Sequence, residues 1–262
     1  MISSLFPKIR ALILDMDGVL WQENEPIGDL PRIFALIRSL GLKVTLATNN
    51  STRTVAQYQD RLESLGVSVE PWQIVTSGIA TAELLARRFP NGGPVYLVGE
   101  AGIKEALEQK GFYLADENVL AVIAGIDRQI SFEKLRRATL LIRRGAPFYG
   151  TNPDRTFPTP EGLILGAGAI LAALETATDI SPIIAGKPEK FMMEVCLSLM
   201  GTVAQETLVV GDRLETDILS GQNCACRTAL VLSGVTSLAQ AQAWRPQPDL
   251  IVANLQTMLE LE

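Results

Sequence analysis

Short runs of Val, Ile and Leu recur along this chain, and each is followed by a polar or glycine-containing turn and then by a helix-compatible stretch. This alternation is typical of βαβ units, in which parallel strands are buried on both faces by crossover helices. Five of the runs lie near the two ends of the chain, at 11–14, 43–47, 207–210, 228–232 and 250–252. Together they predict one doubly wound α/β core with a Rossmann-like parallel sheet, split in the sequence.

A second series of the same kind lies between the two halves of the core. Its expected strands are 95–98, 121–126 and 147–149, and its expected helices are 103–109 and 132–144. Such regular alternation predicts an inserted α/β domain rather than a long loop. Turn-like residues at 77–78 and 178–182 mark the crossings. We therefore expect a core domain at 1–78 and 181–262, with an inserted α/β domain at 79–180.

The composition excludes several kinds of active site. The 262 residues include no histidine, which excludes Ser-His-Asp and Cys-His catalysis and His-ligated zinc or iron. Asp and Glu number 29 against 23 Lys and Arg, and the basic residues are scattered. A nucleic acid polymer or a membrane is therefore not an expected partner. The three cysteines form no CxxC pair, and the N-terminal apolar run is too short for a signal sequence, so the expected location is the cytoplasm.

The first candidate site follows the strand expected at 11–14, where Asp15 and Asp17 stand two residues apart. Residues at this spacing in an extended chain face the same side, and the carboxyl end of a parallel strand is where ligands bind. Two neighbouring carboxylates repel each other, so they favour a shared proton or a bound divalent cation. A capping or turn role is the alternative for this short pattern.

Two further motifs have the composition of anion sites. Thr48, Asn49 and Asn50 lie between an expected strand and an expected helix, where backbone amides, hydroxyls and side-chain amides bind anions. The alternative is a plain helix cap. Lys187 stands before Pro188, which favours an extended lysine whose ammonium group reaches a phosphate. A surface turn is the alternative there.

The fourth motif is a hydrophobic strand that ends at Gly211 and Asp212, with Asp217 five residues further on. Strand-end aspartates are expected at the ligand-binding edge of the sheet. Asp217 is equally compatible with an acid in the first turn of a helix. Taken in order, the four motifs predict one crevice that holds both a cation site and a phosphate site.

In this combination and order the sequence resembles the haloacid dehalogenase (HAD) superfamily. Within it the resemblance is to phosphatases with a large α/β cap between the second and third motifs, such as nitrophenylphosphatases, phosphoglycolate phosphatases and nucleotide monophosphatases. The resemblance covers nearly the whole chain. The matching segments are Asp15-Met-Asp17-Gly-Val-Leu20, Thr48-Asn-Asn50, Gly186-Lys187-Pro188 and 211–217, together with 150–154 in the cap.

The resemblance implies a phosphatase that hydrolyses small phosphomonoesters with magnesium through an aspartyl-phosphate intermediate. Asp15 would be the nucleophile, and Asp17 would be the general acid and then the general base. Mg²⁺ would be held by Asp15, the backbone carbonyl of Asp17 and Asp212. Asp217 would orient the metal site or Lys187.

The same resemblance assigns the substrate contacts. Thr48, Asn49, Asn50 and Lys187 would bind the transferring phosphoryl group. The cap would exclude water and select a small phosphorylated metabolite, and a homodimer is expected by family analogy alone. Candidate cap contacts are Asn152, Asp154 and Arg155, although a tight turn also accounts for this segment.

Two alternative functions use the same nucleophile. A phosphotransferase or phosphomutase would transfer the phosphoryl group to an acceptor other than water. A non-hydrolytic phosphoaspartate signalling module would also use strand-end acids, a threonine and a lysine, but it would need neither the inserted domain nor Asp17.

Overall fold

The computed structural model describes residues 6–159 and 161–260 and divides into two compact units. The first unit comprises Met1–Thr48, Ala56–Val75 and Lys187–Glu262. The second comprises Asn49–Val55 and Thr76–Gly186. The domain bounds expected from the sequence, with breaks after 78 and 180, stay a prediction, and the grouping of the short segment after Thr48 with the second unit was not anticipated.

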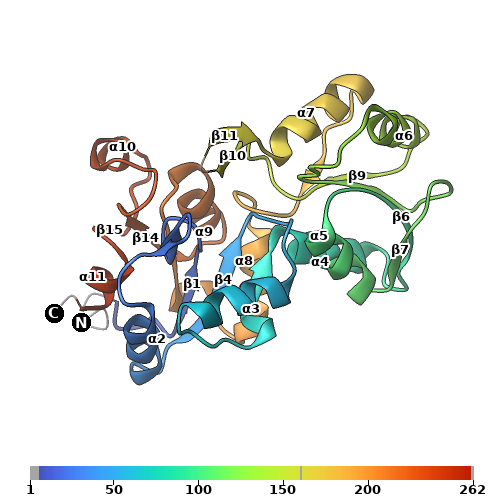
Figure 1. Cartoon of the computed structure of the whole chain (residues 1–262). Coiled ribbons are helices and arrows are strands. Elements are labelled where there is room, and N and C mark those ends of the chain that lie inside the picture. The colour runs from blue at the N-terminus through green and yellow to red at the C-terminus, as the bar shows by residue number, and fades with distance from the viewer. Residues whose placement is uncertain (1–5, 160, 261–262) are drawn as a thin grey trace. The chain divides into compact units, whose positions relative to one another are not determined.

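The first unit contains a six-stranded sheet in the order β15-β14-β13-β1-β4-β5 (Figure 1). Its strands are β1 (Ala11–Leu14), β4 (Lys43–Thr48), β5 (Ile74–Thr76), β13 (Thr207–Gly211), β14 (Arg227–Val231) and β15 (Leu250–Val252). All four residues of β1 are buried, as in a strand covered on both faces, and Ile13 pairs in parallel with Thr45 of β4 and Val209 of β13. Strands β4 and β5 follow on one side of β1, and strands β13, β14 and β15 follow on the other side, so the chain builds the sheet outward in both directions. This order confirms the doubly wound core.

Helices connect these strands, and a short hairpin follows β1. The helices are α2 (Leu30–Ser39), α3 (Val55–Ser64), α8 (Phe191–Met200), α9 (Leu219–Asn223), α10 (Leu238–Ala243) and α11 (Leu255–Glu260), and the hairpin is β2 (Trp21–Gln22) with β3 (Glu25–Pro26). The side chain of Asp29 caps α2 by accepting a hydrogen bond from the Arg32 N–H, and α8 ends at Gly201 in the left-handed region. Within the described residues, none of the helices has the length and apolar character that crossing a membrane requires.

The second unit is built on a five-stranded sheet in the order β12-β9-β8-β6-β7. The strands are β6 (Gly93–Val98), β7 (Phe112–Leu114), β8 (Val122–Ala124), β9 (Phe148–Gly150) and β12 (Ile183–Ile184). All four neighbouring strand pairs of this sheet are parallel, which agrees with the second α/β series expected from the sequence. The unit also contains an antiparallel hairpin of β10 (Thr156–Thr159) and β11 (Gly162–Leu165).

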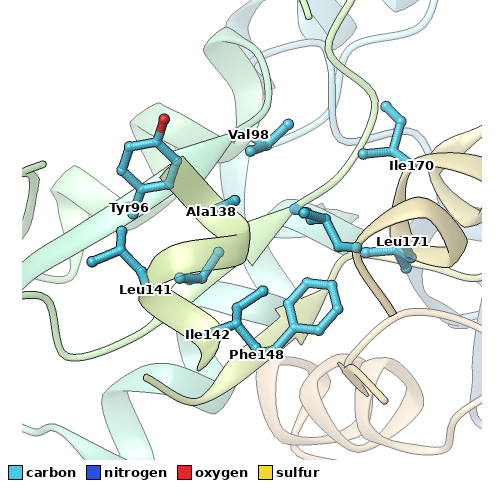
Figure 2. Close-up of a cluster of buried hydrophobic side chains, with 11 residues drawn as sticks. Tyr96, Val98, Ala138, Leu141, Ile142, Phe148, Ile170 and Leu171 are labelled. Atoms are coloured by element: carbon cyan, nitrogen blue, oxygen red, sulfur yellow. The ribbon is translucent and has the colours of Figure 1, made fainter. Parts of the chain in front are cut away.

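Helices cover both faces of this second sheet. They are α4 (Ser77–Arg88), α5 (Ala101–Gln109), α6 (Phe132–Arg143) and α7 (Ala167–Thr178). Tyr96 and Val98 of β6 point toward residues of α6 and α7, as Figure 2 shows, whereas Val95 packs with residues of α4 and α5. The alternation along β6 therefore supplies both apolar layers of the unit.

One local expectation is wrong. Ser77 and Gly78 were expected to form a turn, but they begin α4. The reason is Thr76, whose hydroxyl accepts a hydrogen bond from the Ile79 N–H at 3.2 Å and caps the helix.

Candidate active site

Two strand-end aspartates lie at one edge of the first sheet. Asp15 follows β1, and Asp212 follows the neighbouring strand β13. The parallel register continues past the end of β1, because the Asp15 N–H donates to the Val210 carbonyl oxygen at 2.9 Å. The adjacent strand β4 ends at the buried Thr48, so these residues occupy the carboxyl edge of three neighbouring strands.

Lys187 joins two of the acids. Its Nζ lies 2.6 Å from Asp15 Oδ1, 2.6 Å from Asp217 Oδ1 and 3.0 Å from the Ala47 carbonyl oxygen. These three acceptors satisfy the three protons of an ammonium group, which is only 3% exposed. The lysine is therefore held in one position as a buried cation beside Asp15.

Burial and charge shift the ionisation of this cluster. Burial lowers the pKa of Lys187, but the carboxylates of Asp15 and Asp217 outweigh it and raise this pKa above its usual value. Burial also raises the pKa of Asp15, against the opposing effect of Lys187 and together with repulsion from Asp217. Burial, reinforced by Asp217, raises the pKa of Asp212 to about 6. The cluster therefore contains more negative charge than one lysine neutralises.

The donor set fits a divalent cation. Asp15, Asp212 and Asp217 each offer a carboxylate oxygen within 4.8 Å of the others. The two oxygens of Asp217 accept hydrogen bonds from Lys187 Nζ and from the Arg213 N–H, at 2.6 and 3.0 Å. Asp15 and Asp212 are thus better placed as oxygen ligands of the kind that Mg²⁺ prefers, and Asp217 holds the lysine.

Asp17 lies on the turn after β1, with its side chain exposed at the edge of the cluster. Its Oδ1 accepts a hydrogen bond of 2.8 Å from Trp21 Nε1. Gly18 in this turn has φ +82°, and a Cβ at this position would lie 2.6 Å from Asp212 Cγ. Glycine is therefore required here both for the backbone conformation and for the close approach of Asp212.

The loop after β14 contacts both acidic motifs and was missed by sequence reasoning. The Ser233 hydroxyl donates to the Gly18 carbonyl oxygen at 2.7 Å, and the Val235 N–H donates to Asp212 Oδ2 at 2.8 Å. Between them, Gly234 lies against Asp212. The available signal was position alone, because this loop leaves the same edge of the predicted sheet as Asp212 does.

Gly234→Ala is expected to displace the Asp212 carboxylate, because the added methyl would lie 2.0 Å from its Oδ2. A displacement of this size is expected to lower kcat by about 100-fold and to weaken cation binding. Overpacking should also lower the free energy of unfolding by about 1–3 kcal/mol. Gly78→Ala, whose methyl would meet Ile103 Cα at 3.1 Å, is the control for overpacking. A wild-type affinity for the cation in Gly234→Ala would contradict the expected displacement of Asp212.

Three of the remaining candidate residues contact one another within the second unit. The Asn49 amide donates to Asp154 Oδ2 at 3.0 Å, and the Asn49 carbonyl oxygen accepts hydrogen bonds from Ser77 Oγ and Asn152 Nδ2 at 2.6 and 2.7 Å. Asn152 Oδ1 accepts from the Asp154 N–H at 3.2 Å, which is the pattern of a tight turn. Asn49, Asn152 and Asp154 therefore have contacts that stabilise local structure.

Two other predicted residues stand apart from that group. Asn50 Oδ1 accepts hydrogen bonds from both the backbone N–H and the hydroxyl of Thr52, at 3.0 and 2.8 Å. This is the local capping geometry named above as the alternative to an anion site. Arg155 is exposed to solvent.

Comparison with known proteins agrees with this arrangement. Residues 12–113 match the family model of haloacid dehalogenase-like hydrolases, and residues 184–258 match a second model described as HAD-hydrolase-like. The 5'-nucleotidase YutF of Bacillus subtilis is 37% identical over 87% of this chain and 88% of its own length. The acid sugar phosphatase of Staphylococcus aureus is 35% identical over 97% of this chain and 98% of its own length.

Solved structures share the fold over nearly the full length. The 4-nitrophenylphosphatase of Thermotoga maritima superposes with a TM-score of 0.93 at 31% identity, covering 98% of both chains. NagD of E. coli superposes with a TM-score of 0.89 at 32% identity, covering 97% of this chain and 98% of its own. The chain therefore belongs to the haloacid dehalogenase-like hydrolases, and within them to the phosphatases with an inserted α/β domain.

Proposed function

We propose that this phosphatase hydrolyses small phosphomonoesters with the help of magnesium and through a covalent aspartyl-phosphate intermediate, an acyl phosphate formed on Asp15. The observation that carries the proposal is the contact of Asp15 with the buried Lys187, at 2.6 Å, beside the second strand-end acid Asp212. A carboxylate held by a lysine at the carboxyl edge of a parallel sheet is a suitable nucleophile for phosphorus. The names of the relatives, a nucleotidase, a sugar phosphatase and a nitrophenylphosphatase, support the substrate class.

In the first step, a carboxylate oxygen of Asp15 would attack phosphorus while Lys187 holds the side chain through its hydrogen bond to Oδ1. The bond between phosphorus and the ester oxygen breaks, and the leaving alcohol takes a proton from Asp17. Lys187 stabilises the negative charge on the phosphoryl oxygens, and the Thr48 hydroxyl at the adjacent strand end is proposed to donate a hydrogen bond to them. The product of this step is the phosphorylated aspartate.

In the second step, Asp17 would accept a proton from water while the water oxygen attacks phosphorus. The bond between phosphorus and Asp15 breaks, which releases inorganic phosphate and restores both carboxyl groups. The position of Asp17 supports this exchange, because its side chain is exposed, whereas Asp15 and Asp212 are largely shielded from solvent.

A divalent cation, when bound, supplies positive charge that offsets the repulsion between the carboxylates and a phosphate dianion. Asp15, Asp212 and the backbone carbonyl of Asp17 are the residues proposed to hold it. The role of Asp217 is then to accept a hydrogen bond from Lys187, which keeps the ammonium group beside Asp15. This division is supported by the hydrogen bonds that already involve both oxygens of Asp217.

The proposal is tested by measuring inorganic phosphate release with and without Mg²⁺. The panel should contain 4-nitrophenyl phosphate, nucleoside monophosphates and sugar phosphates, each with and without an added acceptor alcohol. We expect magnesium-dependent release of phosphate in amounts equal to the alcohol liberated. Alcohol liberated without free phosphate would instead show transfer to an acceptor and would overturn hydrolysis as the main reaction.

Magnesium should stabilise the fold more at pH 7.5 than at pH 5. The pKa of Asp212 is raised to about 6 from its usual 3.8. Between these two pH values the folded, metal-free protein therefore keeps the carboxyl proton of Asp212, whereas the unfolded chain has lost it. That contribution to stability is therefore lost as the pH rises from about 4 to 6, and the ionised carboxylate formed is the one that binds a cation. Thermal unfolding with Mg²⁺ or with EDTA at both pH values measures the difference, which should largely disappear in Asp212→Asn.

A further inference from the structure

The side chain of Trp21 makes a direct hydrogen bond to the proposed general acid. Trp21 begins β2 and is fully buried, with 0% of its surface exposed, yet its Nε1 lies 2.8 Å from the Oδ1 atom of the exposed Asp17. An indole N–H is a donor only, so it binds most strongly the carboxyl oxygen that does not carry the proton, because that oxygen is the better acceptor. The contact therefore distinguishes the two oxygens of Asp17.

The indole ring is held firmly in place. The guanidinium group of Arg61 lies over it, 4.2 Å from the ring centroid, and also donates a hydrogen bond to the Glu23 carbonyl oxygen in the same hairpin. The backbone of the turn is fixed as well, because the Gly18 N–H donates to the Trp21 carbonyl oxygen at 2.7 Å and the Trp21 N–H donates to the Met16 carbonyl oxygen at 3.3 Å. The donor thus has a fixed position relative to the backbone of Asp17.

We propose that Trp21 is a positioning residue for Asp17. Its indole N–H fixes Oδ1 of Asp17 and leaves Oδ2 of the same side chain to exchange the proton with the leaving alcohol and with water. This inference rests on the proposed function, in which Asp17 is the acid and then the base. An exposed carboxylate without such a donor rotates among several orientations, and a proton-transfer group is effective only within hydrogen-bond reach of the reacting oxygen. Trp21 restricts Asp17 to one of these orientations without touching substrate.

The test uses Trp21→Phe, which keeps a buried aromatic ring and removes the donor. The enzyme is assayed with an alkyl phosphate, whose leaving group needs a proton, and with 4-nitrophenyl phosphate, whose leaving group needs little help. We expect kcat to fall about 10-fold with the alkyl ester, much less with the nitrophenyl ester, and KM to change little with either. Trp72→Phe, at a tryptophan that is 43% exposed, is the matched control.

A double-mutant cycle separates positioning from a general structural effect. In an Asp17→Ala background, Trp21→Phe should cause no further loss of kcat, because the group that it positions is absent. An equal loss with both esters, or an additive loss in the double variant, would overturn the inference. Absence of phosphate release by the wild-type enzyme would instead contradict the proposed function, so the two failures are distinguishable.

A spectroscopic measurement tests the contact without relying on activity or on the folding of Trp21→Phe. The three tryptophans give three indole N–H resonances, and that of Trp21 is expected to be shifted downfield and protected from exchange with solvent. Asp17→Ala should move this resonance upfield and leave those of Trp72 and Trp244 nearly unchanged. An unchanged Trp21 resonance in Asp17→Ala would overturn the inference.

Discussion

Asp15→Asn is expected to lower the rate of phosphate release by several orders of magnitude while the protein still folds. The amide is not a nucleophile toward phosphorus, so the covalent step is lost, and losses of this size are typical when a nucleophile is removed. The amide oxygen can still accept the hydrogen bond from Lys187, so the contact of 2.6 Å has a replacement. Phosphate release and thermal unfolding, measured on the same preparation, check both parts of the prediction.

The stability of this variant gives a second, independent result. Asn at position 15 removes one of three clustered carboxylates, and the pKa of Asp15 is raised by burial and by repulsion from Asp217 and Asp212 despite the effect of Lys187. We therefore expect the metal-free variant to be at least as stable as the wild type at pH 7.5. Asp60→Asn, at an exposed position on α3, is the control and should change neither quantity. Turnover close to the wild-type rate in Asp15→Asn would rule out Asp15 as the nucleophile.

The sequence was most informative about the core strands of the sheets. The run 11–14 has the uninterrupted apolar character of a parallel strand, which is what burial of every residue of β1 requires. Asp15 follows this run directly. Strand ends of one parallel sheet lie at one edge, which is why Asp15 and Asp212 could be predicted to lie together from opposite ends of the chain. Short edge strands such as β7 and β12 carried too little pattern to be predicted.

The contacts that support the acids could not be predicted in this way. Ser233 and Gly18 are 215 residues apart, and no local pattern indicates that a hydroxyl from one contacts the carbonyl of the other. Only the structure shows that the indole N–H of Trp21 is directed at Asp17. Asn49 and Asp154 were predicted as separate ligand contacts, whereas the structure pairs them with each other at 3.0 Å.

Lys187→Met is expected to lower the free energy of unfolding of the metal-free enzyme by about 3–5 kcal/mol at pH 8, because it leaves buried carboxylates without their cation. The lysine contacts Asp15 and Asp217 at 2.6 Å each and is 3% exposed. Lys187 opposes the rise in the pKa of Asp15, so its contribution is present at high pH and is lost as protonation of the carboxylates removes their charge. The difference from the wild type should therefore be smaller at pH 5 than at pH 8, as measured by urea unfolding in EDTA.

Lys190→Met is the matched control for this substitution. Lys190 is three residues away and pairs with Glu194 at 3.0 Å on the surface, where solvent screens the charges and such a pair contributes little to stability. Adding Asp217→Asn to Lys187→Met should restore part of the stability, because it removes one of the unpaired charges. It should not restore phosphate release, because the ammonium group beside Asp15 is still missing. If the urea midpoint of unfolding of Lys187→Met at pH 8 equalled that of the wild type, the ammonium group would not be neutralising Asp15 and Asp217. Its role would then be limited to contact with the substrate.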